Sequence, residues 1–428
     1  MNKKETVSYC IDSLKKAGAD KAACSLNITE KKELNVEIGE MTLLRTTFNS
    51  NIGISVIKDQ KKGSTSINKT DKSSIDDAIK QVIEMANGSQ VDEAYDISEH
   101  QPTQSFSKGD ESANLNTMYQ SLEEFVDYVK STYPKIQLEA AIMDFNHSKS
   151  FFQNTNGVDF EVREGMYGFS PMFLSKDGKN TSSFNYTGFS ALKVEKPLNE
   201  YGTIDTLLSQ SVEQINTKNI KDKFIGQLLV TPDCIGDFLG FITNDISDAK
   251  MISGNSLYKN KLNKQIAHPK LSLHSFPVSD KIADGYFITS DGYVAENSTI
   301  LDKGILKTHL LGLYGSRKLG GKRSRNDGGA YIVNAGENSH MEMIKNVDKG
   351  VLLSRFSGGS PSNNGDFSGV AKNSYYIENG TIKYPISETM VSGNIQDMFE
   401  NLNEVSSDRI DFGSEILPWI SFEGITIS

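Results

Sequence analysis

The hydrophobic period of this sequence changes repeatedly between that of a helix and that of a strand. Apolar residues recur at helical spacing over residues 5–17, with Gly18 placed to end the helix. From Ala22 to about Asn68 they alternate in short segments, broken by Gly53 and Gly63, that are typical of antiparallel strands. Over residues 74–87 the helical spacing returns. This order of helix, strands and helix predicts an α+β unit.

A similar order recurs after a polar stretch. Residues 89–116 are acidic and almost without periodicity, which is typical of a linker or a long excursion. A third helix is predicted to start at Ser121, where Glu124 completes a capping box. Strands follow over about 136–194, and a further helix over about 204–217. The first half therefore hints at two related units.

The second half is richer in short strands and glycine turns. Residues 225–230 are typical of a buried strand, and Thr231, Pro232 and Asp233 predict a helix start, because they supply a capping hydroxyl, a proline and an acidic residue. We therefore predict an α+β fold of three parts, with a β-rich C-terminal domain. These parts are an N-terminal α+β unit over residues 1–90, a second α+β unit over 91–220 after the polar linker, and the C-terminal domain over 221–428.

The charge balance excludes some classes of function. The 428 residues include 45 basic and 55 acidic ones, giving a net charge of −10, which argues against the basic face of a nucleic-acid binder. No apolar run approaches the ~18 residues of a membrane span. The N-terminal lysines are not followed by the apolar segment of a secretory signal. We expect a cytoplasmic protein that contacts neither membrane nor nucleic acid directly.

No catalytic or metal-binding set can be assembled from the sequence. No two of the six histidines have the spacing of a metal-binding helix, and there is no Gly-x-Ser-x-Gly nucleophile elbow. Cys10 and Cys234 fall on apolar helical faces and Cys24 in an apolar strand, positions that favour structural roles. We expect no catalytic residue, no metal ligand and no cofactor in this chain.

Two glycine-rich segments are candidate working surfaces. The basic stretch 317–329 is either a clamp for a carboxylate or phosphate or a solvated mobile loop. The loop 357–369 either lets a peptide backbone approach closely or is a long β-turn. The candidate substrate- or partner-binding residues in these segments are Arg317, Arg323, Arg325, Asn364, Gly365, Asp366, Phe367 and Ser368.

Several strings of the second half occur in an order that carries a resemblance. They are SDGYVAENSTILDKGILKTHLLGLYGSRKLGG (290–321), NNGDFSGVAKNSYYIENGTI (363–382), ETMVSGN (388–394) and the terminal ILPWISFEGITIS. Together they resemble the TldD/PmbA family, the so-called modulators of DNA gyrase, and FNSNIGISVIKDQKKGSTSIN (48–68) resembles the family's N-terminal strands. The sequence departs from the family at 325–329, where Arg-Asn-Asp-Gly-Gly replaces the usual Thr-Gly-Asn.

The resemblance implies a family with two branches that pair as a heterodimeric protease acting on small or unfolded peptides. In the TldD branch, a His-Glu-x-x-x-His helix and a cysteine near the C-terminus hold zinc. Here the comparable helix, 234–250, has no histidine, and the comparable end, 411–420, has no cysteine. The sequence therefore resembles the PmbA branch, also called TldE, which lacks the zinc ligands.

These observations predict a metal-free subunit of a cytoplasmic metalloprotease complex, with zinc only in its TldD-type partner. The subunit would contribute an enclosing wall and a surface where peptide adds as a strand to an exposed sheet edge. The alternative is a stand-alone peptide-binding or regulatory homodimer without proteolysis. A self-sufficient hydrolase is least favoured, because no nucleophile–base pair or metal cluster can be named.

Overall fold

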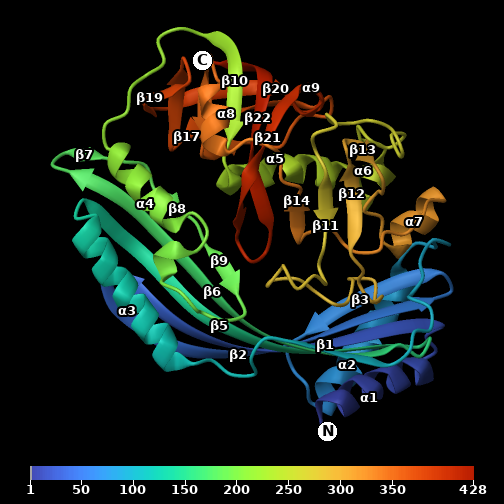
Figure 1. Ribbon diagram of the computed structural model, residues 1–428. Coiled ribbons are helices and arrows are strands. Elements are labelled where there is room, and N and C mark those ends of the chain that lie inside the picture. The colour runs from blue at the N-terminus through green and yellow to red at the C-terminus, as the bar shows by residue number, and fades with distance from the viewer. Residues whose placement is uncertain (1) are drawn as a thin grey trace.

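Two large sheets with helices packed on them make up the computed structural model, which describes residues 2–428 (Figure 1). Helices account for 24% and strands for 41% of the chain. The α+β class is confirmed, including α+β structure in the N-terminal half and a strand-rich C-terminal part.

The first sheet is built on two long antiparallel hairpins. β1 (Lys21–Glu37) pairs with β2 (Glu40–Lys58), and β5 (Ile136–Asn154) pairs with β6 (Asp159–Asp177). Because β1 also pairs with β5, both predicted units contribute to one continuous sheet of order β3-β2-β1-β5-β6-β4. The remaining strands of this sheet are β3 (Lys61–Ile67), β4 (Gln104–Lys108), β7 (Asn180–Thr181), β8 (Asn185–Tyr186) and β9 (Phe189–Ala191).

The prediction of short segments between Ala22 and Asn68 was wrong. β1 has 17 residues and β2 has 19. Gly53 looked like a strand break, but it lies inside β2, where a Cβ would come within 2.9 Å of the Ser25 hydroxyl. The glycine therefore serves the close approach of two strands rather than a turn.

Helices cover the two ends of this sheet. α1 (Lys3–Lys16) and α2 (Lys72–Gly88) share one apolar cluster with β1 and β2. At the other end, a second cluster contains residues of three helical segments. These are α3 (Leu115–Thr132), the 3₁₀ helix η1 (Leu198–Glu200) and α4 (Ile204–Glu213).

Two predicted boundaries need correction. α3 begins at Leu115 rather than at Ser121, because the Asn114 side chain caps it by accepting the backbone N–H of Thr117 at 3.2 Å. The polar stretch 89–116 includes β4, which pairs in parallel with β6. β4 has only five residues and lies at the end of the sheet order, so it is too short to give a clear alternation of polar and apolar residues in the sequence.

The second sheet follows the path β13-β12-β11-β14-β22-β10-β15-β18-β19, with the other strands branching from it. Its strands are β10 (Phe224–Val230), β11 (Leu273–Ser275), β12 (Ser298–Asp302), β13 (Ile305–Leu306), β14 (Tyr331–Val333), β15 (Lys349–Leu353), β16 (Arg355–Gly358), β17 (Asp366–Lys372), β18 (Ser374–Glu378), β19 (Thr381–Ile386), β20 (Thr389–Asn394), β21 (Leu402–Asp411) and β22 (Ile416–Ile427). The helices of this half are α5 (Pro232–Asp245), α6 (Asp248–Ser253), α7 (Leu313–Leu319), α8 (His340–Lys345) and α9 (Ile395–Glu400).

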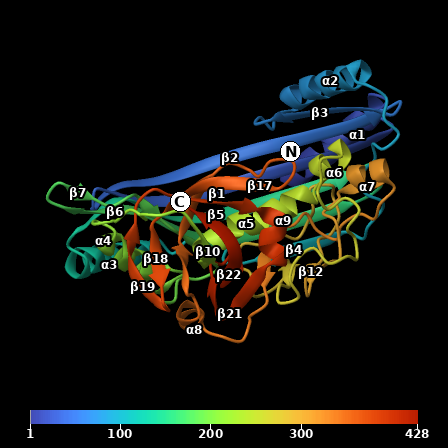
Figure 2. The same cartoon turned by 90° about the horizontal axis from the view of Figure 1, so that it is seen from above.

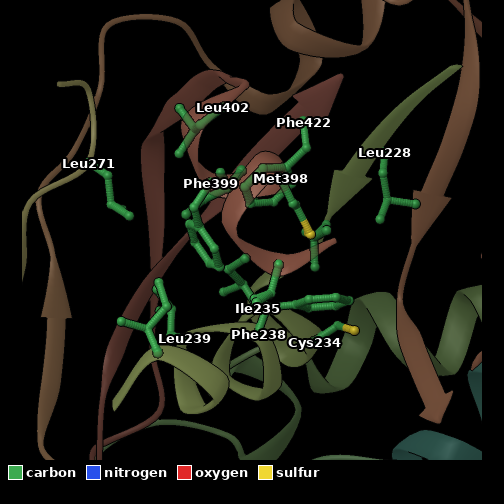
Figure 3. Close-up of a cluster of buried hydrophobic side chains, with 14 of the residues drawn as sticks. Leu228, Cys234, Ile235, Phe238, Leu239, Leu271, Met398, Phe399, Leu402 and Phe422 are labelled. Carbon is green, nitrogen blue, oxygen red and sulfur yellow. The ribbon is translucent and has the colours of Figure 1, made fainter. Parts of the chain in front are cut away.

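The core of the second half forms around α5 (Figure 3). Ile235, Phe238 and Leu239 project from one face of this helix toward side chains of β10, α9 and β22, and all three are fully buried. The predicted strand and helix start are confirmed, with Thr231 at the N-cap. The Thr231 hydroxyl makes no capping hydrogen bond, however. Of the three predicted start signals, only the proline and the acidic residue in the first turn have the expected place and role.

Among the described helices, none is both long enough and apolar enough to cross a bilayer.

Candidate functional site

A polar cleft lies between the first sheet and loops of the second half. Two neighbouring hollows, of about 360 and about 130 Å³, share Asn146, Met166 and Asp284. In Figure 1 the second half lies above the strands β5 and β6 that supply the cleft floor. The further lining residues come from β4, β5, β6 and β9 and from second-half loops, and they include Lys108, Asp144, Ser148, Glu164, Ser190, Phe412 and Ser414.

The floor comes from one face of β5 and β6, and the same face continues onto β1, whose residues do not line the hollows. Opposed residues of an antiparallel pair lie on the same face, and the register places Asn146 opposite both Lys31 and Met166. The same register places Asp144 opposite Glu33, and Ser148 opposite Glu164. The result is a continuous polar strip across β1, β5 and β6.

A network of ion pairs lies at one end of this strip. The Lys31 ammonium lies 2.9 Å from the Glu33 carboxylate and 3.1 Å from that of Asp144, while Arg45 of β2 lies 2.8 Å from Glu33. Burial alone would raise the pKa of Glu33, but the hydrogen bond from Lys31 holds it below its usual range. Burial raises the pKa of Asp144. The network thus contains two carboxylates and two cationic side chains.

At the other end of the strip, two carboxylates face each other across the cleft. Burial raises the pKa of Glu164, and the charge of Asp284 adds to the effect. Burial likewise raises the pKa of Asp284. Lys108 inserts between the halves and donates to the backbone carbonyls of Ser279, at 3.5 Å, and Ile282. The positive charge of Lys108 opposes this rise in pKa at both carboxylates, so this end of the strip already holds charges of both signs and suits an extended polar chain.

A second acidic pair marks the place where α5 meets the turn between β21 and β22. A Cβ on Gly236 of α5 would lie 3.3 Å from a carboxylate oxygen of Glu415. Burial raises the pKa of Glu415 to about 7, and the charge of Asp237 adds to the effect. Ser414, the neighbour of Glu415 in the turn, lines the larger hollow, whereas Asp237 and Glu415 do not line it.

We expect Glu415 to make stability fall with rising pH. Its pKa is higher in the folded protein than the ordinary 4.5, so the folded state binds the proton more tightly, and this stabilisation is lost as the pH rises from about 4.5 to about 7. Glu415→Gln should flatten the dependence of the free energy of unfolding on pH over this window. Urea denaturation at several pH values checks it, with Glu84→Gln, at an exposed position of α2, as control. A Glu415→Gln profile that is parallel to the wild type contradicts the prediction.

The segments that the resemblance equates with the zinc-bearing ones do meet, but their donors do not fit zinc. Neither α5 nor the β21–β22 turn contains histidine, the turn contains no cysteine, and the one cysteine of α5, Cys234, is buried in the apolar core. Over residues 2–428, no group of three or more His, Cys, Asp or Glu side chains is placed to hold a metal ion. Cys10, Cys24 and Cys234 are all buried, and burial raises the pKa of the Cys234 thiol.

The basic segment is structured, and its three arginines are paired. Arg317 lies 3.1 Å from Asp96. Arg323 forms a two-pronged pair with Asp291, at 2.6 and 2.8 Å. Arg325 lies 3.4 Å from Glu296, with both side chains more than half exposed. Part of the segment forms α7, so the alternative of a solvated mobile loop does not describe it as a whole.

The second candidate segment forms the start of β17. Asp366 accepts a hydrogen bond from the Asn394 amide at 2.9 Å, and the register pairs Asp366 with Asn394 and Ser368 with Ser392. The Gly-Asp-Phe-Ser and Ser-Gly-Asn strings are therefore neighbours in one ladder. Phe367 is buried against Phe238, so its side chain belongs to the core.

The two candidate segments lie in different parts of the second half. α7 and β17 are well separated in both Figure 1 and Figure 2. Asn364 donates to Asp366 at 2.8 Å, and Gly365 has a φ of +91°, so these residues shape the turn that leads into β17. The structure does not bring them together with Arg317, Arg323 and Arg325.

Sequence reasoning missed the cleft residues. Asn146 and Ser148 stand in a run of half-buried polar residues, 146–150 of β5, and Glu164 follows another half-buried charged residue in β6, so no alternation of polar and apolar residues marks them. The partner residue Asp284 comes from a distant loop with no motif of its own.

The fold and the cleft define a class of two-sheet α+β proteins with a polar cleft between their halves. Family models place the chain more narrowly: the PmbA/TldA metallopeptidase C-terminal domain matches residues 226–428, and the PmbA/TldA metallopeptidase domain 1 matches residues 24–86. The chain belongs to the PmbA/TldD family of metalloprotease-like proteins.

Individual relatives agree with this placement. The chain is 25% identical to the metalloprotease PmbA homolog of Haemophilus influenzae, over 98% of this chain and 96% of that protein. It spans 53% of the length of another relative, the metalloprotease PmbA homolog of Buchnera aphidicola. The fold matches a proposed modulator of DNA gyrase from Bacteroides thetaiotaomicron (TM-score 0.88, 21% identity, 99% of this chain and 98% of that one) and TldE from Thermococcus kodakarensis (0.84, 16%, 99% and 100%).

Proposed function

We propose that this chain is the metal-free subunit of a metalloprotease assembly that processes small or unfolded peptides. A zinc-bearing TldD-type partner would supply the metal and the hydrolytic chemistry. This chain would supply a wall of the enclosing chamber and a surface for the peptide, without catalytic residues of its own.

One observation carries the proposal. α5 and the β21–β22 turn meet at the border of the polar cleft, and the residues at that meeting point are Gly236, Asp237 and Glu415. The resemblance equates these segments with the zinc-bearing ones, yet here they meet at two carboxylates, neither segment has a histidine, and Cys234 of α5 is buried in the apolar core. The relatives that are named metalloproteases support a role in proteolysis.

The cleft supports a peptide rather than a small apolar ligand. Its floor includes polar side chains of β5 and β6, and Lys108, Glu164 and Asp284 supply charges of both signs. An extended peptide can lie on such a floor through backbone hydrogen bonds with little demand on its sequence.

We expect zinc-dependent cleavage of an unfolded peptide only when this chain and a TldD-type protein of the same organism are combined. The reason is that this chain lacks zinc ligands, whereas the TldD-type protein lacks the chamber wall that this chain would supply. Co-purification, metal analysis and a cleavage assay with and without a chelator check it. Stoichiometric zinc in the chain alone, or separate migration of the two proteins at micromolar concentration, contradicts the proposal.

A second candidate is a peptide-binding or regulatory homodimer without proteolysis. The long unpaired edge of β2 favours it, because an open edge can accept a strand from another chain. Absence of a TldD-type gene from the source genome would decide for this candidate.

A further inference from the structure

The face of the first sheet that forms the cleft floor continues beyond the two hollows as an apolar surface. Side chains two residues apart in a strand lie on the same face, so Met172 of β6 follows Gly168 and Ser170, which line the larger hollow. Tyr186 of β8 lies opposite Met172 in the ladder and therefore shares this face. Met172 is 39%, Tyr186 58% and Phe184, two residues before Tyr186, 47% exposed. We call Met172, Phe184 and Tyr186 the apolar shelf.

The backbone that carries the two aromatic residues of the shelf is anchored to the second half. The Phe184 carbonyl accepts hydrogen bonds from the Arg355 guanidinium at 2.7 Å and from the Asn373 amide at 2.9 Å. Asn185, between the two aromatic residues, is buried. Phe184 and Tyr186 therefore stay exposed on a backbone that is held in place, as expected of a surface that receives another molecule.

Two cations without a carboxylate partner border the apolar shelf. Arg355 of β16 and Lys372 of β17 lie directly opposite each other in their ladder. The Arg355 guanidinium also lies over the Tyr186 ring, 5.4 Å from its centroid. Within residues 2–428, neither cation forms an ion pair. Like charges that lie opposite each other destabilise a ladder, so this place favours the binding of an anionic group.

The apolar shelf and the two cations together suit an apolar side chain that lies close to a carboxylate. An aromatic or aliphatic side chain can pack on Met172 and Tyr186. The Arg355 guanidinium has five N–H donors, and its bond to Phe184 leaves donors for a carboxylate. A peptide offers this combination at its carboxyl end when the last residue is apolar, because the α-carboxylate and that side chain leave the same Cα.

We propose that the apolar shelf receives the carboxyl end of a peptide whose last side chain is aromatic or aliphatic, while the preceding residues lie on the polar cleft floor. This inference rests on the proposed function and deepens it by naming the class of peptide. Along β6, Glu164 and Met172 are eight residues apart, which is about 26 Å in an extended strand. An unfolded peptide of similar length can therefore reach from the charged end of the floor to the shelf.

Peptide binding to the full chain, followed by fluorescence anisotropy, tests the inference. We expect a labelled unfolded peptide of about eight residues that ends in Phe to bind. Amidation of its carboxylate, or Ser in place of the last Phe, should each weaken binding at least about 10-fold in Kd, the effect of losing one charge-assisted hydrogen bond or one apolar contact.

Two variants assign these preferences to the shelf. Arg355→Gln, which can still donate to the Phe184 carbonyl, should remove the preference for the free carboxylate. Met172→Ser, at an exposed position, should reduce the preference for Phe over Ser. Lys80→Gln and Met85→Ser are the matched controls, because both residues are exposed on α2 at the other end of the sheet, and both preferences should survive in them.

Each result bears on the inference. Equal affinity for the acid and the amide, equal affinity for the Phe and Ser peptides, or preferences that survive in Arg355→Gln and Met172→Ser overturn it. So does a peptide that binds neither the chain alone nor the chain combined with a TldD-type protein. A cleavage assay with the TldD-type protein reports separately on the proposed function. Binding with both preferences but without cleavage contradicts the proteolytic role and leaves the shelf, whereas cleavage without either preference contradicts the shelf alone.

Discussion

Asp291→Ala is expected to lower the free energy of unfolding by about 3–5 kcal/mol, the usual cost of removing one partner of a buried ion pair. The Asp291 carboxylate accepts hydrogen bonds from Arg323, from the Thr289 hydroxyl at 2.6 Å and from the Leu313 backbone at 2.8 Å. Both side chains of the ion pair are less than a fifth exposed. The variant would leave the Arg323 charge buried without its carboxylate, and urea denaturation measures the loss.

The control for this prediction is the exposed pair in the same segment. Glu296→Ala removes the partner of Arg325, where both side chains are well exposed, so the loss should stay below about 1 kcal/mol. If the two variants lose equal stability, the burial of the Asp291–Arg323 pair does not matter.

The same pair should contribute to acid sensitivity. Burial alone would raise the pKa of Asp291, but the hydrogen bonds from Arg323 and Thr289 outweigh it and hold the pKa below the ordinary 3.8. A lowered folded-state pKa means that the stabilisation is present above pH 3.8 and is lost as the pH falls through the folded value. Asp291→Asn should therefore lose less stability than wild type on acidification below pH 3.8.

Phe238→Ala is expected to cost about 3–5 kcal/mol of stability, the range for removing a large aromatic side chain from a core. Phe238 is fully buried, and its ring lies 5.2 Å from that of Phe356 and 5.7 Å from that of Phe367. It therefore links α5 to the β16–β17 hairpin. Urea denaturation of the variant gives the change in the free energy of unfolding.

Two controls accompany this variant. Phe238→Leu keeps most of the volume and should cost less than about 1.5 kcal/mol, if the neighbours repack as volume-conserving swaps allow. Ile225→Ala, at an exposed apolar position, should change stability by less than about 0.5 kcal/mol. A loss of under about 1 kcal/mol in Phe238→Ala would show that the aromatic cluster collapses around the gap.

The correct predictions concern features that a short stretch of chain determines. α1, α2 and α5 were predicted from apolar residues at helical spacing, and Gly18 and Pro232 from the conformations that glycine and proline favour. The errors arose where a local signal had two meanings. Gly53 was interpreted as a break because a glycine in a turn and a glycine at a close strand contact look alike in sequence.

The cleft illustrates why the rest was not predictable. Glu164 and Asp284 influence each other although they are far apart in the chain. Asp291 lies in the family string 290–321 and Arg323 in the basic segment 317–329, but neither segment predicted that the two side chains pair. Such contacts depend on how strands from distant segments align, and the alternation within one strand carries no information about its neighbour.

By itself the sequence determined the α+β class, the buried cysteines and the family resemblance, because periodicity, residue type and motif order are properties of the chain alone. Only the tertiary structure decided that β1 and β5 join the first half into one sheet, that Arg317 pairs with Asp96 and Arg323 with Asp291, and that β3 pairs with β2 no further than Ile52. These features depend on which strands pair and in what register, and strand pairing is set by the packing of the whole molecule.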